Sequence, residues 1–274
     1  MNCRTTNESD MLNTVRVPKQ FEPIFQKAQE YVSDYFSLKR EDASTGKIEV
    51  FDERYILIRA ASMSVDFFDT IKEMLNDWGE EKASEMARSL LFDIAHSIGK
   101  TDARSFHQKM CVNDPIEKLS AGPIHFAYTG WAFVDISAES KPTANEDYYL
   151  LYDHPFSFEA DAWENSGKKS SSCVCTMNAG YSSGWCEESF GIPLVASEIT
   201  CKARGDSTCR FIMAQPSRIE QFLHDYLHKH PEIPDNPSLY KIGGFIQEFK
   251  LAQDALQNKE HQLVQVAEDT DGQI

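Results

Sequence analysis

The chain has 274 residues, of which 41% are hydrophobic and 11% aromatic, so it can bury a sizeable core and wholesale disorder is excluded. Its net charge of −16 argues against a nucleic-acid-binding surface, because phosphate binding requires clustered lysine and arginine. The polar amino-terminus does not resemble a signal peptide, and no apolar run approaches the ~20 residues of a membrane span. We therefore expect a cytoplasmic protein without a membrane partner.

The first 45 residues predict a polar lead followed by an amphipathic helix. Residues 1–17 are expected to be disordered. From Phe21 to Tyr35, apolar residues recur at helical spacing and form one stripe. This stripe is typical of a helix that packs on its own domain or of a dimerisation helix, and both interpretations stay open. Residues 39–47 are expected to form a polar connection.

A strand and two helices are predicted next. The near-continuous apolar run from Arg54 to Ala61 is typical of a strand. Ser64 is expected to cap a helix that ends at Gly79. Another apolar stripe begins at Ala83 and predicts a second helix, with Gly99 as its stop.

The middle of the chain is expected to alternate between loops and strands. Residues 113–123 predict a loop that ends at a Gly-Pro pair. His125–Ile136 and Asp147–Tyr152 have the composition of strands. A short helix is expected over Phe158–Trp163.

The last third predicts a helix, a hairpin and a helical tail. The helix spans Asn178–Phe190, and the hairpin strands span Leu194–Thr200 and Thr208–Met213. After a further helix that opens at Pro216, apolar residues from Ile242 to Val266 recur at heptad spacing. This seam indicates a signalling coiled coil or a helix docked on its own domain. We divide the chain into an amino-terminal tail and helix (1–45), a central domain (46–215) and a carboxy-terminal helical linker (216–274).

The seven cysteines favour thiols or metal ligands over disulfides in a cytosolic chain. Zinc prefers four ligands of thiolate, imidazole or carboxylate type. Glu198 and Cys201 end one predicted strand and Cys209 lies on the next, so a hairpin would bring these three together. Cys175 would complete a structural site that has no open position for water. Spacing alone leaves buried apolar thiols as an alternative, and Cys173 as a competing first ligand.

Several motifs in order carry a resemblance to a known family. Residues 47–215 resemble the sensory domain of XylR/DmpR-type aromatic-responsive transcription activators, which joins an activator-of-aromatic-catabolism segment to a 4-vinyl-reductase (V4R) segment. Besides the predicted strand and helix pair, the matching motifs are Asp114-Pro115, Gly122-Pro123-x-His125, Ser157-Phe158-Glu159-Ala160, Gly180-Tyr181-x2-Gly184-Trp185, Glu198-x2-Cys201 and Gly205-Asp206-x2-Cys209-Arg210-Phe211.

The resemblance implies a mixed α/β (α+β) fold related to haem-nitric-oxide-binding and Golgi-transport domains. The family's zinc site, three cysteines and a glutamate, falls on Cys175, Glu198, Cys201 and Cys209. A histidine matching His125 would hydrogen-bond a phenolic hydroxyl.

The chain also departs from the phenol-binding members of the family. His154 occupies the place of their tryptophan, and Trp185 stands where a second tyrosine is usual. The resemblance and these departures together make the ligand-binding candidates His125, Tyr152, His154, Tyr181 and Trp185.

The sequence therefore favours a zinc-containing, non-enzymatic regulatory domain that binds a small aromatic or hydrophobic effector. We expect a homodimer that signals through its flanking helices. The family's ATPase and DNA-binding modules are absent from these residues, so an output module of kinase, PAS or ATPase type would act in trans or lie outside them. Two alternatives stay open: a V4R protein acting as a tetrapyrrole 4-vinyl reductase or accessory, and a ligand-free dimeric scaffold.

Overall fold

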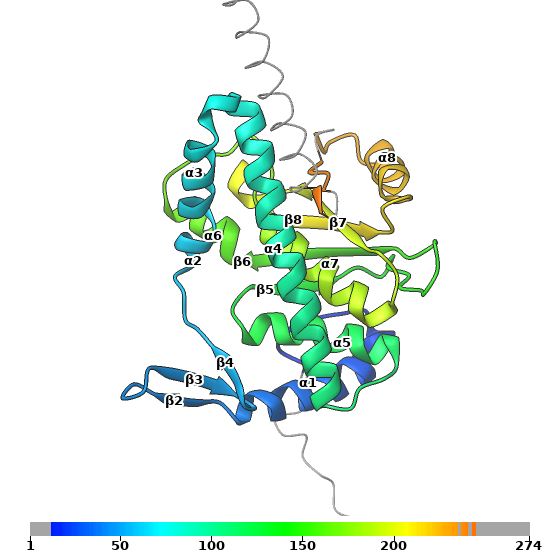
Figure 1. The fold of residues 1–274 in the computed structure, drawn as a ribbon. Helices are drawn as coiled ribbons and strands as arrows, with labels where there is room; N and C mark the ends of the chain where they lie inside the picture. Colours follow the sequence, from blue (N-terminus) through cyan, green and yellow to red (C-terminus); the bar gives the residue numbers. More distant parts are fainter. Residues whose placement is uncertain (1–11, 235–236, 241–242, 245–274) are drawn as a thin grey trace, which may run out of the picture.

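A five-stranded sheet forms the centre of the molecule in the computed structural model, which describes residues 12–234, 237–240 and 243–244 (Figure 1). Its strands, in spatial order, are β1 (Val15–Arg16), β5 (Ala132–Ile136), β6 (Leu150–Ser157), β8 (Cys209–Ala214) and β7 (Val195–Thr200). β1 pairs with β5 in parallel, and the other neighbours are antiparallel. The lead predicted to be disordered through residue 17 is therefore wrong for its last residues, because β1 adds to the sheet edge.

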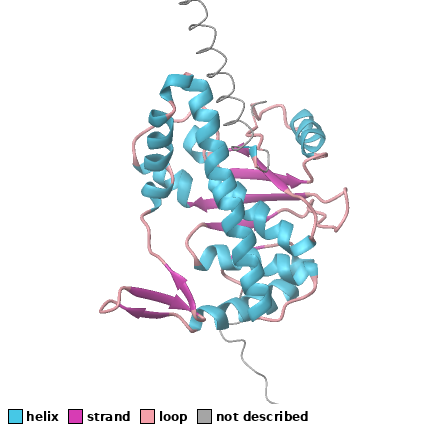
Figure 2. Cartoon of the chain, viewed as in Figure 1, coloured by secondary structure: helices cyan, strands magenta, loops and turns pink. Residues whose placement is uncertain are grey.

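The helices are distributed over both faces of this sheet. Those in the described residues are α1 (Glu22–Ser37), α2 (Ala60–Met63), α3 (Val65–Met74), α4 (Glu80–Lys109), α5 (Pro115–Tyr128), α6 (Phe158–Asn165), α7 (Thr176–Phe190) and α8 (Ile219–Lys229), with short 3-10 turns η2 (Lys19–Phe21), η3 (Asn76–Trp78) and η4 (Lys202–Arg204). α5 and α7 pack on one face of the sheet, and α4 crosses over α7 (Figure 2). Side chains alternate along β8, so Met213 faces the α7 side while Arg210 reaches Tyr226 of α8 on the other face.

The apolar stripe of α1 is buried within its own chain. Phe25, Ala28, Val32 and Tyr35 belong to the main hydrophobic core, and the helix packs against α5. The predictions of helices at α6, α7 and α8, and of the β7–β8 hairpin, are confirmed within one to three residues at most ends. The heptad seam from Ile242 to Val266 lies almost entirely outside the described residues.

A second sheet stands where a connection and a longer strand were predicted. It consists of β2 (Arg40–Asp42), β3 (Lys47–Val50) and β4 (Glu53–Tyr55). Phe51 and Asp52 form the tight turn between β3 and β4, with φ of 47° and 65°. A two-residue hairpin turn with both central residues at positive φ is ordinarily signalled by Asn or Gly, and the Phe-Asp pair does not carry that signal.

The strand predicted over Arg54–Ala61 ends at Tyr55. The next apolar residues continue without a strand partner, and Ile56 and Leu57 are 74% and 90% exposed. Apolar composition indicated a buried strand, but these side chains face solvent. In Figure 1 this segment bridges the small sheet and α2.

The predicted helix stop at Gly99 is wrong, because α4 continues to Lys109. Gly99 serves a close crossing instead: a Cβ atom there would lie 2.1 Å from the carbonyl oxygen of Tyr181 on α7. Gly180 and Gly184 of α7 are equally close to the backbone of α4 at Phe92 and His96. The two helix backbones are therefore in direct contact, with no room for side chains between them.

The loop predicted over 113–123 is also wrong, because α5 covers most of it and continues to Tyr128. The strand predicted over His125–Ile136 is confirmed only from Ala132, where β5 begins. Asp114 caps α5 by accepting hydrogen bonds from the backbone N–H groups of Ile116 and Glu117. Pro123 lies inside the helix and does not end it. The Gly-Pro pair indicated a break, but packing of the helix on the core overrides this local signal.

No helix among the described residues is both long enough and apolar enough to cross a membrane.

Candidate metal centre and effector cavity

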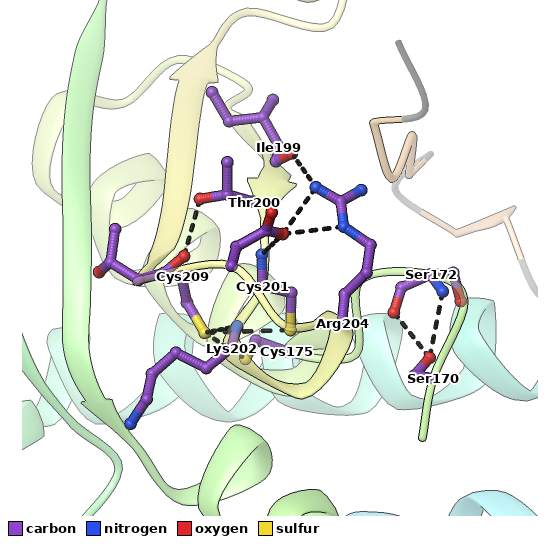
Figure 3. A network of polar contacts seen from close by, with 11 residues as sticks. Ser170, Ser172, Cys175, Ile199, Thr200, Cys201, Lys202, Arg204 and Cys209 are labelled. Carbon is purple, nitrogen blue, oxygen red and sulfur yellow. Dashed lines mark hydrogen bonds and ion pairs between the residues drawn. The ribbon is translucent and has the colours of Figure 1, made fainter. Parts of the chain in front are cut away.

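The side chains of three buried cysteines and one buried glutamate meet at one end of the β7–β8 hairpin. One potential ligand atom from each of Cys175, Glu198, Cys201 and Cys209 lies within 4.8 Å of all the others. The Sγ atom of Cys209 is 3.5 Å from that of Cys175 and 3.9 Å from that of Cys201 (Figure 3). All four residues are fully buried. Cys173, the competing first ligand, is not a member of this group.

A short turn after β7 positions two of these side chains. Cys201 precedes the 3-10 turn η4, and Cys209 begins β8. The carboxylate of Asp206 accepts hydrogen bonds from the backbone N–H of Cys201 and from Nε of Arg204, each at 2.8 Å. Arg204 in turn donates to the carbonyl oxygen of Ile199 at 3.0 Å (Figure 3). These bonds hold the turn in the shape that points both thiols inward.

The remaining two ligands come from β7 and from the start of α7. Oε2 of Glu198 accepts a hydrogen bond from the backbone N–H of Cys175 at 2.8 Å, whereas its Oε1 has no hydrogen-bond partner in the residues that the structure describes. Burial raises the pKa of the Glu198 carboxyl and of the Cys175 thiol well above their ordinary values. Such a cluster is unfavourable as anions unless a cation compensates it. Three thiolates and one carboxylate match the donors that zinc prefers, so the residues fit the ion.

Glu159 of the Ser157-Phe158-Glu159-Ala160 motif also supports the start of α7. Glu159 is buried and accepts the backbone N–H groups of Met177 and Asn178 at 3.0 and 2.8 Å. Burial raises its pKa to about 8. Because the first N–H groups of a helix lack intrahelical partners, Glu159 fixes the end of α7 that carries Cys175.

A small cavity of about 40 Å³ lies between α5, α7 and the central sheet. Its wall contains no Asp, Glu, Lys or Arg and is formed by Leu119, Gly122, Pro123, Phe126, Val134, Ile136, Leu150, Tyr152, His154, Tyr181, Ser182, Trp185, Cys186 and Met213. Four of the five predicted ligand-binding residues therefore share one cavity wall, although they come from β6 and α7. The fifth, His125, is not part of the wall.

His154 is the polar side chain in this wall that lacks partners. It is fully buried, and neither ring nitrogen has a hydrogen-bond partner within the described part of the chain. Burial lowers the pKa of its imidazole to about 3, so the ring is neutral at physiological pH. Its neighbours are the rings of Phe126, Tyr152 and Phe211, with centroids 4.6 to 5.7 Å away. A buried polar group without a partner costs free energy, which a ligand hydroxyl would recover.

The polar atoms of the other aromatic wall residues are satisfied by the protein. The hydroxyl of Tyr152 lies 2.7 Å from Oγ of Ser182, and Nε1 of Trp185 donates to the carbonyl oxygen of Lys118 at 3.0 Å. The indole of Trp185 also lies against Gly122, where a Cβ atom would come within 2.7 Å of the ring. These contacts fix the shape of the wall, and His154 is the wall residue whose polar atoms have no hydrogen-bond partner among the described residues.

His125 faces Tyr181 instead of the cavity. Its Nδ1 lies 3.1 Å from the Tyr181 hydroxyl, which donates to Oδ2 of Asp102 at 3.0 Å. Because that hydroxyl has one proton, it accepts from Nδ1–H of His125, which assigns the tautomer of the ring. Burial lowers the pKa of His125 to about 3 and raises that of Asp102 to about 6. Asp102 lies far from these residues in the sequence, and no local pattern indicated it.

Comparisons with known proteins agree with this architecture. Residues 35–140 match the XylR N-terminal family, described as activator of aromatic catabolism. A search of curated proteins found no match. Among solved structures, the chain is similar to the crystal structure of the phenol-responsive sensory domain of the transcription activator PoxR with phenol. The TM-score is 0.57 at 22% identity, over 68% of this chain and 89% of that chain.

The resemblance to the XylR N-terminal family is thus confirmed over residues 35–140. The structural similarity shows that the chain has the mixed α/β fold of a sensory domain. Assignment of the later residues to a V4R segment stays a prediction.

Proposed function

We propose that this chain is a sensory domain that binds a small aromatic effector in the cavity lined by His154. Binding would pass a conformational change to a signalling or transcriptional output. The observation that carries the proposal is a neutral, fully buried imidazole that has no hydrogen-bond partner among the described residues, in a cavity wall without charged side chains. The family match and the phenol-responsive structural relative support the same ligand class.

The wall defines the chemistry of the effector. Its aliphatic and aromatic side chains favour an apolar ligand, and His154 offers one hydrogen bond as donor or acceptor. The volume of about 40 Å³ exceeds the ~10–15 Å³ that a single water requires but is smaller than the ~150 Å³ of a cavity that holds benzene, so an aromatic ring requires the wall side chains to move apart. A phenol combines an apolar ring with one hydroxyl that can bond His154.

We further propose that Cys175, Glu198, Cys201 and Cys209 hold a zinc ion. Zinc would neutralise the buried thiolates and carboxylate and tie the β7–β8 hairpin to the start of α7. Four protein ligands leave no position for a substrate or water, so the role is structural. The ion would hold α7, which carries Tyr181 and Trp185, against the sheet.

A homodimer with an output module of kinase, PAS or ATPase type completes the proposal. The exposed side chains of Ile56, Leu57 and Phe156 give the described surface apolar area that association would cover. Size-exclusion chromatography with light scattering measures the mass in solution.

The direct test is a ligand screen with the purified protein. We expect phenol to raise the melting temperature more than toluene does, because only phenol can bond His154, and we expect benzoate to have no effect. Isothermal titration calorimetry then measures the affinity. If phenols, alkylbenzenes and other small hydrophobic compounds all leave the melting temperature unchanged, the chain is not an aromatic sensor.

A further inference from the structure

After α8 the chain returns to the sheet and attaches to its β7 edge. The described residues of this return, 237–240 and 243–244, are called the exit strap here. The backbone N–H of Ser238 donates to the carbonyl oxygen of Glu198 at 3.0 Å, and Oγ of Ser197 donates to the carbonyl oxygen of Ser238 at 2.5 Å. β7 is the last strand of the sheet, so its outer edge has unpaired backbone groups that accept an added segment.

Tyr240 is the side chain that anchors the exit strap. It is buried, and its ring stacks on Phe92 of α4 with centroids 4.6 Å apart and an interplanar angle of 11°. Its hydroxyl lies 3.1 Å from Oγ1 of Thr176. A buried tyrosine needs a partner for its hydroxyl, and Thr176 provides one, so a tyrosine is favoured over a phenylalanine at position 240. Further along, the backbone N–H of Gly243 donates to Oδ1 of Asp93 at 2.8 Å.

The anchor points belong to the elements that form the metal centre and the cavity. Glu198 is a candidate metal ligand, and Thr176 directly follows another, Cys175. Thr176 is also the first residue of α7, the helix that presents Tyr181, Ser182 and Trp185 to the cavity. Phe92 touches α7 as well, because its carbonyl oxygen would lie 2.3 Å from a Cβ atom at Gly180.

We propose that the exit strap couples α7 to the chain that leads to the carboxy-terminus, with Tyr240 as its latch. α7 is one helix of 15 residues, so a displacement at Tyr181 or Trp185 moves Thr176 with it. Because the backbones of α4 and α7 are in direct contact, there is no free space into which α7 can shift without displacing its neighbours. A shift of α7 therefore breaks or remakes the Tyr240–Thr176 bond and loosens or fixes the strap.

The latch rests on the proposed sensory function in one respect only: effector binding is the event that would move α7. The coupling itself can be tested without any effector, by hydrogen exchange on the full-length, zinc-loaded chain. We expect Tyr240→Ala to speed amide exchange at Ser238 and Gly243 by about 10-fold or more, and at Met177 and Asn178 in the first turn of α7 by several-fold. Zinc transfer to a chromogenic chelator should also accelerate.

Two milder variants keep the test valid if Tyr240→Ala does not fold. Tyr240→Phe and Thr176→Val each remove the latch bond and keep the side-chain volume, and each should speed exchange at Ser238 and Met177 by about 3- to 10-fold. The matched control is Tyr226→Phe, which removes a buried tyrosine hydroxyl bonded to Arg210 on the other face of the sheet. It should leave exchange in the strap unchanged.

The outcomes separate a latch from a passive contact. Faster exchange confined to the strap, with unchanged exchange in α7 and unchanged zinc release, would overturn the coupling. With phenol bound, unchanged exchange in the strap would overturn transmission while leaving the sensory function intact. If phenol does not bind, the proposed function fails for that ligand, and the variants alone decide whether the latch exists.

Discussion

The hydroxyl of Tyr181 joins α7 to α4 by donating to Asp102 at 3.0 Å, while the ring of the same tyrosine forms part of the cavity wall. A ligand that displaces this ring must therefore disturb a buried hydrogen bond to a carboxylate. The neighbouring imidazole of His125, which is not part of the cavity wall, completes the network. Cavity shape and the α4–α7 contact are thus linked through one side chain.

The Asp102 carboxyl predicts a pH dependence of stability. Burial raises its pKa to about 6 from 3.8, so the folded state binds its proton more tightly than the unfolded state does. The stabilisation that comes from tighter proton binding at Asp102 is fully present below pH 3.8 and is lost as the pH rises through about 6. We expect wild type to lose about 1 kcal/mol relative to Asp102→Asn between pH 5 and 7, measured by urea unfolding. A difference between the two proteins that does not vary with pH would contradict this assignment.

Loss of the proposed zinc ion should destabilise the whole domain. Cys201→Ser removes a candidate zinc ligand and leaves the buried partners without compensation. Because a structural zinc contributes about 10–16 kcal/mol in small domains and total stability is typically about 5–15 kcal/mol, the variant should be largely unfolded or lack a cooperative transition. Plasma mass spectrometry for zinc and circular dichroism on heating provide the measurements.

The control for the metal prediction is Cys111→Ser, since Cys111 is exposed and does not belong to the cluster. It should retain zinc and melt like wild type. A Cys201→Ser protein without zinc but with wild-type stability would refute a structural role for the metal.

His154 should determine which effectors bind. Replacing it with phenylalanine keeps a ring in the wall and removes the hydrogen bond. We expect phenol affinity to fall about 5- to 100-fold, whereas toluene affinity stays within about 3-fold, as measured by calorimetry. His224→Phe, at an exposed histidine of α8, is the matched control. An equal loss for both ligands would mean that His154 acts through packing alone.

The glycines of the α4–α7 crossing should tolerate no side chain. In Gly180→Ala the new Cβ would lie 2.3 Å from the carbonyl oxygen of Phe92, so the helices must separate. We expect a loss of roughly 2–3 kcal/mol in the free energy of unfolding, as for overpacked cores. Gly191→Ala has open space around its Cβ and only the strain of a φ of 69°, so it should cost about 1 kcal/mol. Equal losses in the two variants would argue against a tight crossing.

Local sequence signals succeeded where the chemistry is local. Glu198, Cys201 and Cys209 lie on one hairpin, so their convergence followed from strand spacing and a tight turn. The contribution of Cys175 over Cys173 came from the family resemblance, because the position of that loop depends on how α7 packs.

Long-range packing explains the errors. Pro123 and Gly122 indicated a break, yet α5 continues through them because its faces are buried. Gly99 resembled a helix stop, and only the partner helix shows that it is a contact point. Asp102 and the strap residues Ser238 and Tyr240 are brought to the site from distant parts of the chain. No window of sequence could have placed them there.

The uncharged wall of the cavity has a consequence for discrimination among related metabolites. Neither His154 nor His125 becomes positively charged near neutral pH, and the wall has no lysine or arginine. A carboxylated aromatic compound would lose its hydration inside without meeting a counterion, at a cost of several kcal/mol. The domain would therefore prefer an unoxidised aromatic compound to its acidic breakdown products, because the carboxylate is too costly to bury. No side chain would need to contact the carboxylate for this discrimination.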